Sequence, residues 1–154
     1  MKTIFVVDDN NTNLLMAKEA LDGTYRALAI PSAEKMFELM AKIKPDLILL
    51  DVEMPGMDGY TALTKLKQIE KTAKIPVIMI TAYTSDLLEA QALEAGAADF
   101  ITKPFAKPVL LNRVKAHLRI AEMGELLETV ADLLFSGNFK AAAEYADEYM
   151  RKPR

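Results

Sequence analysis

Two kinds of segment, each with its own pattern of apolar residues, alternate along this chain. Short apolar runs begin near Thr3, Tyr25, Asp46, Ile75 and Asp99, and runs of this length are typical of buried strands. Between them lie amphipathic segments with the 3.6-residue period of helices. Strands and helices that alternate in this way predict an α/β fold: a doubly wound five-stranded parallel sheet flanked by five helices and joined by right-handed crossovers.

Capping and turn residues set the limits of the expected helices. Ser32 is a suitable N-cap for the second helix, and Gly23 and Gly96 end the first and the fourth. Pro108 opens the fifth helix, where its missing N–H costs nothing. The predicted helices run from about residue 12 to 21, 33 to 44, 60 to 69 and 86 to 95, and onward from about 107.

Beyond about Ala121 the five-unit pattern is complete, and the remaining residues also have helical periodicity. A stripe with spacings of three and four extends over about two heptads and comprises Ile120, Met123, Leu127, Val130 and Leu134. Residues 136–138 interrupt it, and a second stripe runs from Phe139 to Met150. We therefore expect one domain over residues 1–121 and an extension over 122–154. The extension is a helical hairpin, a long helix with a shorter one folded back, or a connector to a further domain.

Composition and charge restrict the function classes. A chain of 154 residues with 51% apolar residues can form one full core. The net charge of −3 and the absence of a basic arm argue against direct nucleic-acid binding. The chain has no cysteine, no signal-peptide pattern and no apolar run long enough for a bilayer. We expect a cytoplasmic protein that does not bind a membrane.

Acidic residues follow two of the apolar runs directly. Asp8 and Asp9 come after residues 3–7, and Asp51 comes after residues 47–50. In an open α/β sheet, strand ends of this kind meet at the crevice where ligands bind. Three neighbouring carboxylates repel one another unless a cation or proton intervenes, and an all-oxygen set suits Mg²⁺ better than zinc. The pattern predicts a magnesium site.

Residues 2 to about 121 resemble the receiver domain of bacterial two-component response regulators, a chemotaxis-regulator-like domain with a flavodoxin-like fold. The family's marks occur in order: the pair Asp8–Asp9, the loop Asp51-x-x-Met54-Pro55-x-Met57-Asp58-Gly59, Thr81 followed by Ala82, and Lys103-Pro104-Phe105. Each mark falls at the end of a predicted strand. The resemblance implies the strand order 2-1-3-4-5.

The resemblance also implies the chemistry. A phosphoryl group would pass from a sensor histidine kinase or a phosphotransfer protein to Asp51, and the protein would later hydrolyse its own acyl phosphate. Asp9 and Asp51 would bind Mg²⁺ directly, Asp8 would act largely through water, and the Glu53 carbonyl would complete the protein ligands. The Lys103 ammonium would pair with Asp51 and later with phosphate.

Further roles follow from the same resemblance. Thr81 would donate its hydroxyl to the phosphate, and the small Ala82 would leave access for the attacking group. Phe100, where many relatives have tyrosine, would rotate inward on activation, and the changed surface would be the fourth helix, fifth strand and fifth helix. Glu53 and Tyr83 would tune the lifetime of the acyl phosphate. His117, the single histidine, is expected to be solvated or to pack within its helix rather than to carry phosphate.

The same residues argue against three other function classes. A haloacid dehalogenase-type phosphatase would carry a second Asp two positions after the nucleophile, where this chain has Glu53. A nucleotide carrier would have a glycine- or hydroxyl-rich loop after the first strand, where this chain has Asp8-Asp9-Asn10-Asn11. An unphosphorylated receiver-like scaffold would not need Asp51, Thr81 and Lys103 together. We expect a regulator, not an enzyme that turns over a separate substrate.

The extension leaves two arrangements open. The stripe from Ile120 to Leu134 is too apolar to stay exposed, so it would pack either on the stripe from Phe139 to Met150 or on a second subunit. We favour a homodimer, because two short helices cover each other only partly. The cognate kinase, the pathway and the output partner cannot be read from the sequence.

Overall fold

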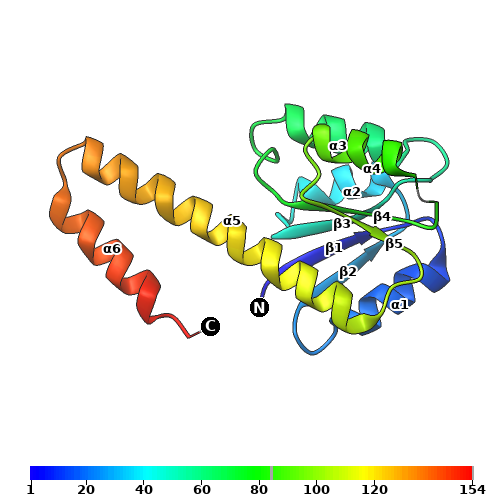
Figure 1. The fold of residues 1–154 in the computed structure, drawn as a ribbon, viewed down its shortest axis with the longest axis horizontal. Helices are drawn as coiled ribbons and strands as arrows, with labels where there is room; N and C mark the ends of the chain where they lie inside the picture. Colours follow the sequence, from blue (N-terminus) through cyan, green and yellow to red (C-terminus); the bar gives the residue numbers. More distant parts are fainter. Residues whose placement is uncertain (84, 154) are drawn as a thin grey trace. The chain divides into compact units, whose positions relative to one another are not determined.

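Five parallel strands form the centre of the protein, which we describe from a computed structural model covering residues 1–83 and 85–153. The strands are β1 (Thr3–Val7), β2 (Arg26–Ile30), β3 (Leu47–Asp51), β4 (Val77–Thr81) and β5 (Asp99–Thr102). They lie in the order β2-β1-β3-β4-β5 (Figure 1). The predicted fold class and strand order are confirmed. β4 begins two residues later than the apolar run from Ile75 indicated.

Helices follow each strand, as the periodicity predicted. They are α1 (Asn11–Leu21), α2 (Ala33–Met40), α3 (Gly59–Gln68), α4 (Asp86–Glu94), α5 (Lys107–Phe135) and α6 (Phe139–Arg151). Each of the first four begins after a side chain that accepts a hydrogen bond from the amide three residues on, namely Asn10, Ser32, Asp58 and Ser85. Such caps satisfy amides that the first helical turn leaves without a partner.

Two apolar clusters cover the two faces of the sheet. Figure 1 shows α2, α3 and α4 on one face and α1 with the first part of α5 on the other. Side chains alternate between the faces along a strand, so in β1 Phe5 and Val7 enter one cluster while Ile4 and Val6 enter the other. With both faces covered, every residue of β3 and β4 is buried. This packing fixes the strand ends that carry the candidate site.

The chain divides into two compact units, one over Met1–Leu118 and one from Arg119 onward. α5 is a single helix of 29 residues that begins in the first unit and ends in the second. In the second unit, α5 ends before Ser136, and α6 starts after the cap Asn138 and turns back along α5 (Figure 1). This is the predicted long helix followed by a shorter one.

The apolar stripes of the extension do not cover each other. Ile120, Met123, Leu127 and Leu134 in α5 are exposed, as are Phe139 and Met150 in α6. Burial is found instead at neighbouring positions: Leu126, Val130 and Leu133 are half-buried in α5, and Ala142 is buried in α6. Packing within the chain therefore does not bury the predicted stripe of α5. Within the described part of the chain, no helix is long and apolar enough to cross a bilayer.

Candidate functional site

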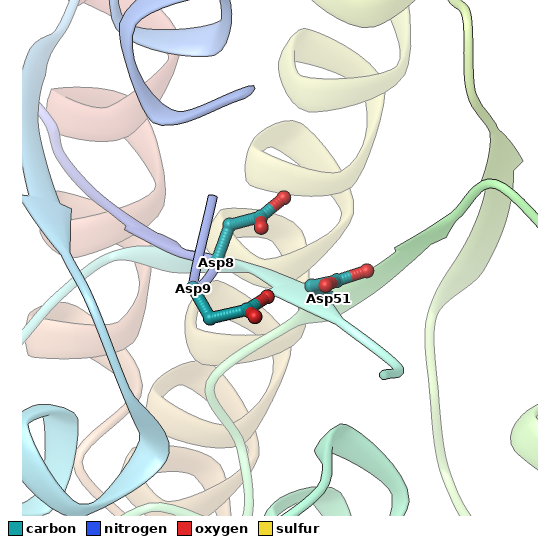
Figure 2. A group of neighbouring side chains, drawn as sticks. All are labelled: Asp8, Asp9 and Asp51. Atoms are coloured by element: carbon teal, nitrogen blue, oxygen red, sulfur yellow. The ribbon is translucent and has the colours of Figure 1, made fainter. Parts of the chain in front are cut away.

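Three carboxylates meet at the carboxyl ends of β1 and β3. Asp8 and Asp9 follow β1, and Asp51 is the last residue of β3. One carboxylate oxygen from each lies within 4.8 Å of the others (Figure 2). Asp8 and Asp51 are buried, whereas Asp9 is exposed and leaves the cluster open to solvent. Because all three donors are oxygens, the cluster fits a hard cation such as Mg²⁺.

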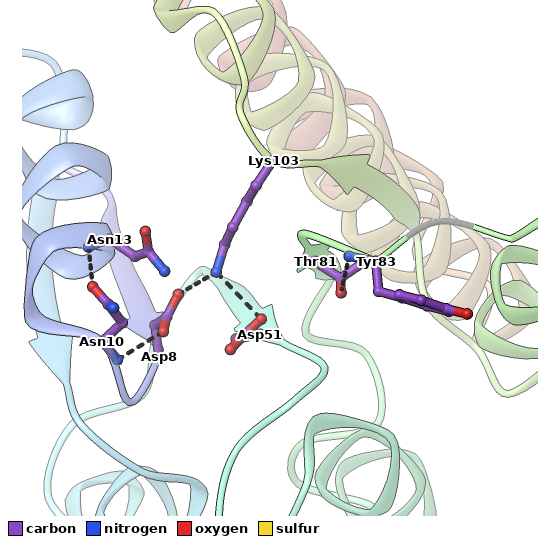
Figure 3. A network of polar contacts seen from close by, with 7 residues as sticks. All are labelled: Asp8, Asn10, Asn13, Asp51, Thr81, Tyr83 and Lys103. Atoms are coloured by element: carbon purple, nitrogen blue, oxygen red, sulfur yellow. Dashed lines mark hydrogen bonds and ion pairs between the residues drawn. The ribbon is translucent and has the colours of Figure 1, made fainter.

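A single lysine neutralises part of this charge. Lys103, which follows β5, places its Nζ 2.5 Å from Oδ2 of Asp8 and 3.3 Å from Oδ1 of Asp51 (Figure 3). The peptide bond that joins it to Pro104 is cis. The sequence led us to expect a contact with Asp51 alone. The ammonium instead bridges two carboxylates and is nearer to Asp8.

Asp8 is held at both of its oxygens. Oδ1 accepts a hydrogen bond from the amide of Asn10 at 2.9 Å, and Oδ2 accepts one from Lys103 (Figure 3). Asn10 in turn caps α1 by accepting from the amide of Asn13. The start of α1 thus fixes the orientation of the Asp8 carboxylate.

Asp51 is the carboxyl group whose ionisation is most affected by the fold. It is 7% exposed at the end of a fully buried strand. Burial raises its pKa to about 6; the Lys103 ammonium opposes this effect, and the Asp8 and Asp9 carboxylates add to it. Ionisation of Asp51 is therefore less favourable than that of a free carboxyl group, and a bound cation would stabilise the ionised form.

The loop from Asp51 to Asp58 is held close to the end of β3. The amide of Gly59 donates to the carbonyl of Val52 at 2.8 Å. A Cβ at position 59 would lie 1.9 Å from the carbonyl oxygen of Asp51, so only glycine fits there. The sequence showed this glycine as part of a motif, and the structure supplies the physical reason for it.

A contact from α2 holds the same loop from outside. Oε1 of Glu34 accepts a hydrogen bond from the amide of Met57 at 2.9 Å. A hydrogen bond from this amide is the main cause that lowers the pKa of Glu34. Gly56, with a φ of +76°, lies directly beside the same carboxylate. Nothing in the sequence connected Glu34 with the site, because the contact spans 23 positions and depends on how α2 is placed.

Thr81 ends β4 beside the acidic cluster. Its side chain is buried, and its Oγ1 accepts a hydrogen bond from the amide of Tyr83 at 3.1 Å (Figure 3). The hydroxyl proton of Thr81 is not used in that bond. Ala82 and the Tyr83 side chain are both exposed at the mouth of the site.

Phe100 in β5 is packed inward. It is 8% exposed and, with Thr81, Tyr83 and Glu53, lines a cavity of about 20 Å³. The cavity is too small to accept another large side chain. The structure thus brings Asp8, Asp9, Asp51 and Lys103 into one cluster, and it places the remaining predicted residues around the adjacent cavity and its rim.

His117 lies outside this cluster. Its Nε2 is 2.9 Å from Oδ2 of Asp99, whose Oδ1 accepts from Arg113 at 2.7 Å. Burial alone would raise the pKa of Asp99, but these hydrogen bonds and one from the Phe100 amide lower it below its ordinary value. His117 therefore joins α5 to β5, next to Phe100, and it does not face Asp51.

Comparison with known proteins agrees with this geometry. The family model for the response regulator receiver domain matches residues 4–115. The chain belongs to the response regulator receiver family. The matched segment contains each residue of the acidic cluster, together with Thr81, Phe100 and Lys103.

Individual relatives show the same similarity. The chain is 40% identical over 125 residues to the phosphate regulon transcriptional regulatory protein PhoB of Pseudomonas aeruginosa, covering 80% of this chain and 55% of that one. It is 42% identical over 120 residues to response regulator PleD of Caulobacter vibrioides, covering 75% of this chain and 26% of that one. The chain thus spans about a quarter to about half of the length of these relatives.

A solved structure shows the same fold. The signal receiver domain of a signal transduction histidine kinase from Syntrophus aciditrophicus is 34% identical, with a TM-score of 0.71. The match covers 77% of this chain and 91% of that one. The protein is thus a receiver domain of two-component signalling, which is consistent with a switch controlled by phosphorylation.

Proposed function

We propose that Asp51 is the phosphoacceptor of this receiver and that Mg²⁺ is required for its phosphorylation. The observation that carries the proposal is the position of Asp51 between the Lys103 ammonium and two further carboxylates at the ends of parallel strands. Nucleophilic attack by a carboxylate on a phosphoryl group needs the opposing negative charges to be neutralised and held in place.

The phosphoryl donor is a phosphohistidine on a sensor histidine kinase or on a phosphotransfer protein. An oxygen of the Asp51 carboxylate attacks phosphorus, the P–N bond to the imidazole breaks, and the imidazole keeps the bonding pair and takes up a proton. The product is an acyl phosphate on Asp51. Hydrolysis later returns the carboxylate and releases inorganic phosphate, so the protein acts as a regulator and not on a separate substrate.

The carboxylates of Asp9 and Asp51 and the carbonyl of Glu53 would hold Mg²⁺, and Asp8 would act mainly through water. When bound there, Mg²⁺ supplies positive charge next to the transferred phosphoryl group. Lys103 keeps its contact with Asp8 and exchanges Asp51 for a phosphate oxygen. The Asp8 contact makes this exchange a short movement, because the ammonium is already anchored.

Thr81 and Phe100 connect the phosphate to the rest of the domain. The free hydroxyl proton of Thr81 binds a phosphate oxygen, and Ala82 leaves room for the donor group. Phe100 already occupies the inward position expected after activation, and rotation of its ring between this position and an outward one would change the surface formed by α4, β5 and α5. Exposed Tyr83 and Glu53 stand where they hinder or orient the hydrolytic water and so set the lifetime of the acyl phosphate.

We further propose that residues 1–121 form the receiver, that residues 122–154 form a helical extension or connector, and that the chain forms a homodimer in the cytoplasm. The exposed stripe on α5 supports the dimer. Acidic composition supports the absence of direct contact with nucleic acid or membrane for this segment. Output partners would be contacted through the face that changes on phosphorylation.

Intact-mass spectrometry tests the phosphoacceptor. Incubation with acetyl phosphate and Mg²⁺ is expected to add one phosphoryl group to the wild-type protein and none to Asp51→Asn. Lys103→Ala should still bind Mg²⁺ but label poorly. A label that survives in the Asn variant would place the nucleophile elsewhere.

A further inference from the structure

Little apolar packing holds α4 on the sheet. Among the described residues of this helix only Ala92 is buried, whereas the neighbouring α3 buries Gly59, Ala62, Leu63 and Leu66. Two of the leucines of α4, Leu87 and Leu93, are exposed. Stabilisation grows with the apolar area that is buried, and an alanine buries much less area than a leucine. A single polar contact therefore has more influence on the position of α4 than it would have on that of α3.

Tyr60, the second residue of α3, makes such a contact with α4. Its Oη donates a hydrogen bond to the carbonyl oxygen of Gln91 at 3.3 Å, and Figure 1 shows the two helices next to each other on one face of the sheet. The same carbonyl accepts a hydrogen bond from the amide of Ala95 at 3.0 Å. A carbonyl oxygen has two lone pairs and can accept both bonds. Tyr60 thus ties the last turn of α4 to the start of α3.

The start of α3 is itself fixed to the strand that carries the phosphoacceptor. The amide of Gly59 donates to the carbonyl of Val52 at 2.8 Å, and the backbone of Gly59 lies so close to that of Asp51 that no Cβ fits. Tyr60 follows Gly59 directly, so its Cα has a fixed position relative to Asp51. A movement of the last turn of α4 relative to Asp51 must therefore stretch or break the hydrogen bond from Tyr60.

The ring of Tyr60 also lines the cavity beside the site. Ala92 of α4 lines this cavity of about 20 Å³ as well, together with Thr81 and Phe100 from the two neighbouring strands. Phe100 is buried there, in the inward position expected after activation. While α4 is tied down, Ala92 stays beside the cavity and the ring of Phe100 remains enclosed. If the last turn of α4 moves away, space opens in which the ring can turn outward.

We propose that Tyr60 is a positioning residue for phosphorylation: its hydroxyl holds α4 against the cavity and thereby stabilises the arrangement in which Phe100 lies inward. The inference rests on Asp51 as the proposed phosphoacceptor. A contact that favours the state to which a phosphoryl group binds better raises the apparent affinity by up to the factor by which it shifts the equilibrium between the states. The net contribution of one hydrogen bond corresponds to a factor of about two to ten.

Calorimetric titration with beryllofluoride in saturating Mg²⁺ tests this coupling, because beryllofluoride binds a carboxylate oxygen in the shape of a phosphoryl group. Tyr60→Phe removes the hydroxyl and keeps the ring, so its affinity for beryllofluoride should fall about two- to tenfold. Its affinity for Mg²⁺ alone should not change, because the carboxylate cluster keeps its contacts. Tyr145→Phe in α6 is the matched control: Tyr145 is 40% exposed and Tyr60 39%, and the control should bind beryllofluoride as the wild type does.

Hydrogen exchange measures the tether directly. In metal-free Tyr60→Phe the amide of Ala95, which shares the acceptor with Tyr60, should exchange about two- to tenfold faster, while protection within α3 stays the same. Unchanged exchange at Ala95 would overturn the proposal, as would an equal loss of beryllofluoride affinity in Tyr145→Phe. A lower melting temperature of Tyr60→Phe with unchanged beryllofluoride affinity would also overturn it, because Tyr60 would then only stabilise the fold.

Labelling of the wild type by acetyl phosphate separates this proposal from the one on which it rests. A wild-type protein that is not labelled at Asp51 overturns the phosphoacceptor and the coupling together. A wild-type protein that is labelled, with equal beryllofluoride affinity in Tyr60→Phe, overturns the role of Tyr60 alone.

Discussion

Replacing Asp51 by asparagine is expected to stabilise the metal-free protein. Burial raises the pKa of Asp51 from 3.8 to about 6, so the ionised carboxylate is less favourable in the folded than in the unfolded chain. Each pKa unit corresponds to about 1.4 kcal/mol, which makes the penalty at neutral pH about 3 kcal/mol. Asp51→Asn removes the charge and keeps an oxygen that can accept from Lys103.

The sign of the pH dependence follows from the direction of the shift. Between pH 3.8 and about 6 the folded chain holds a proton on Asp51 that the unfolded chain has lost, so wild-type stability falls as the pH rises through this window. Above about pH 6 the penalty is complete. The difference between Asp51→Asn and wild type should therefore be small at pH 4 and largest at pH 7.5.

Thermal unfolding in EDTA measures this difference. For a chain of this size 1 kcal/mol shifts the melting temperature by about 2–4 °C, so the Asn variant should melt roughly 6–12 °C higher at pH 7.5. Millimolar Mg²⁺ should raise the wild-type melting temperature and reduce the gap, since a cation held by the proposed site would bind the folded chain and not the unfolded one. The control Asp132→Asn makes the same chemical change on an exposed helix position and should alter stability by less than about 0.5 kcal/mol. An Asn variant that is no more stable than wild type in EDTA, or a gap equal at both pH values, would refute the reasoning.

Three further changes test the surroundings of the site. Gly59→Ala should lower the free energy of unfolding by about 2–3 kcal/mol in urea titrations, because its Cβ collides with the Asp51 backbone; a neutral effect would contradict the contact. Glu34→Ala should slow acetyl phosphate labelling several-fold. Glu34→Gln keeps the accepting oxygen and should label at nearly the wild-type rate. An equal loss of labelling in both variants would show that this oxygen does not position the loop. The lowered pKa of Asp99 adds stability above about pH 4 that disappears as the pH falls through the folded value. Asp99→Asn should therefore differ from wild type at pH 7 and converge with it in acid, and a constant difference would exclude the hydrogen bonds of Arg113 and His117 as the source of this stability.

The sequence predicted the sheet and the acidic cluster because both depend on local patterns. Five apolar runs with helical segments between them leave few topologies, and parallel strands bring their carboxyl ends to one edge. This puts Asp8, Asp9 and Asp51 at one edge of the sheet. The family resemblance supplied the strand order, which makes β1 and β3 neighbours and places Thr81 and Lys103 at the ends of the next two strands.

The features that the sequence did not predict depend on the placement of whole elements and on side-chain rotamers. Periodicity does not tell that Lys103 lies nearer to Asp8 than to Asp51, or that Glu34 reaches the loop before α3. The extension shows the same limit. Its helices and the break at residues 136–138 were predicted, but the covered face of α5 lies beside the apolar stripe, because several faces of a helix rich in Leu and Ala can pack.

The charges joined by the bridge from Lys103 to Asp8 and Asp51 also have a consequence for how the protein responds to magnesium. The formal charges of the three carboxylates and the ammonium sum to −2, which one divalent cation would balance. An acyl phosphate replaces one negative charge by about two, so the phosphorylated site would attract the cation more strongly. Because coupling between two binding events is reciprocal, magnesium would favour the phosphorylated protein by the same factor. The fraction of this regulator that is switched on would then follow the free magnesium concentration as well as the activity of its kinase.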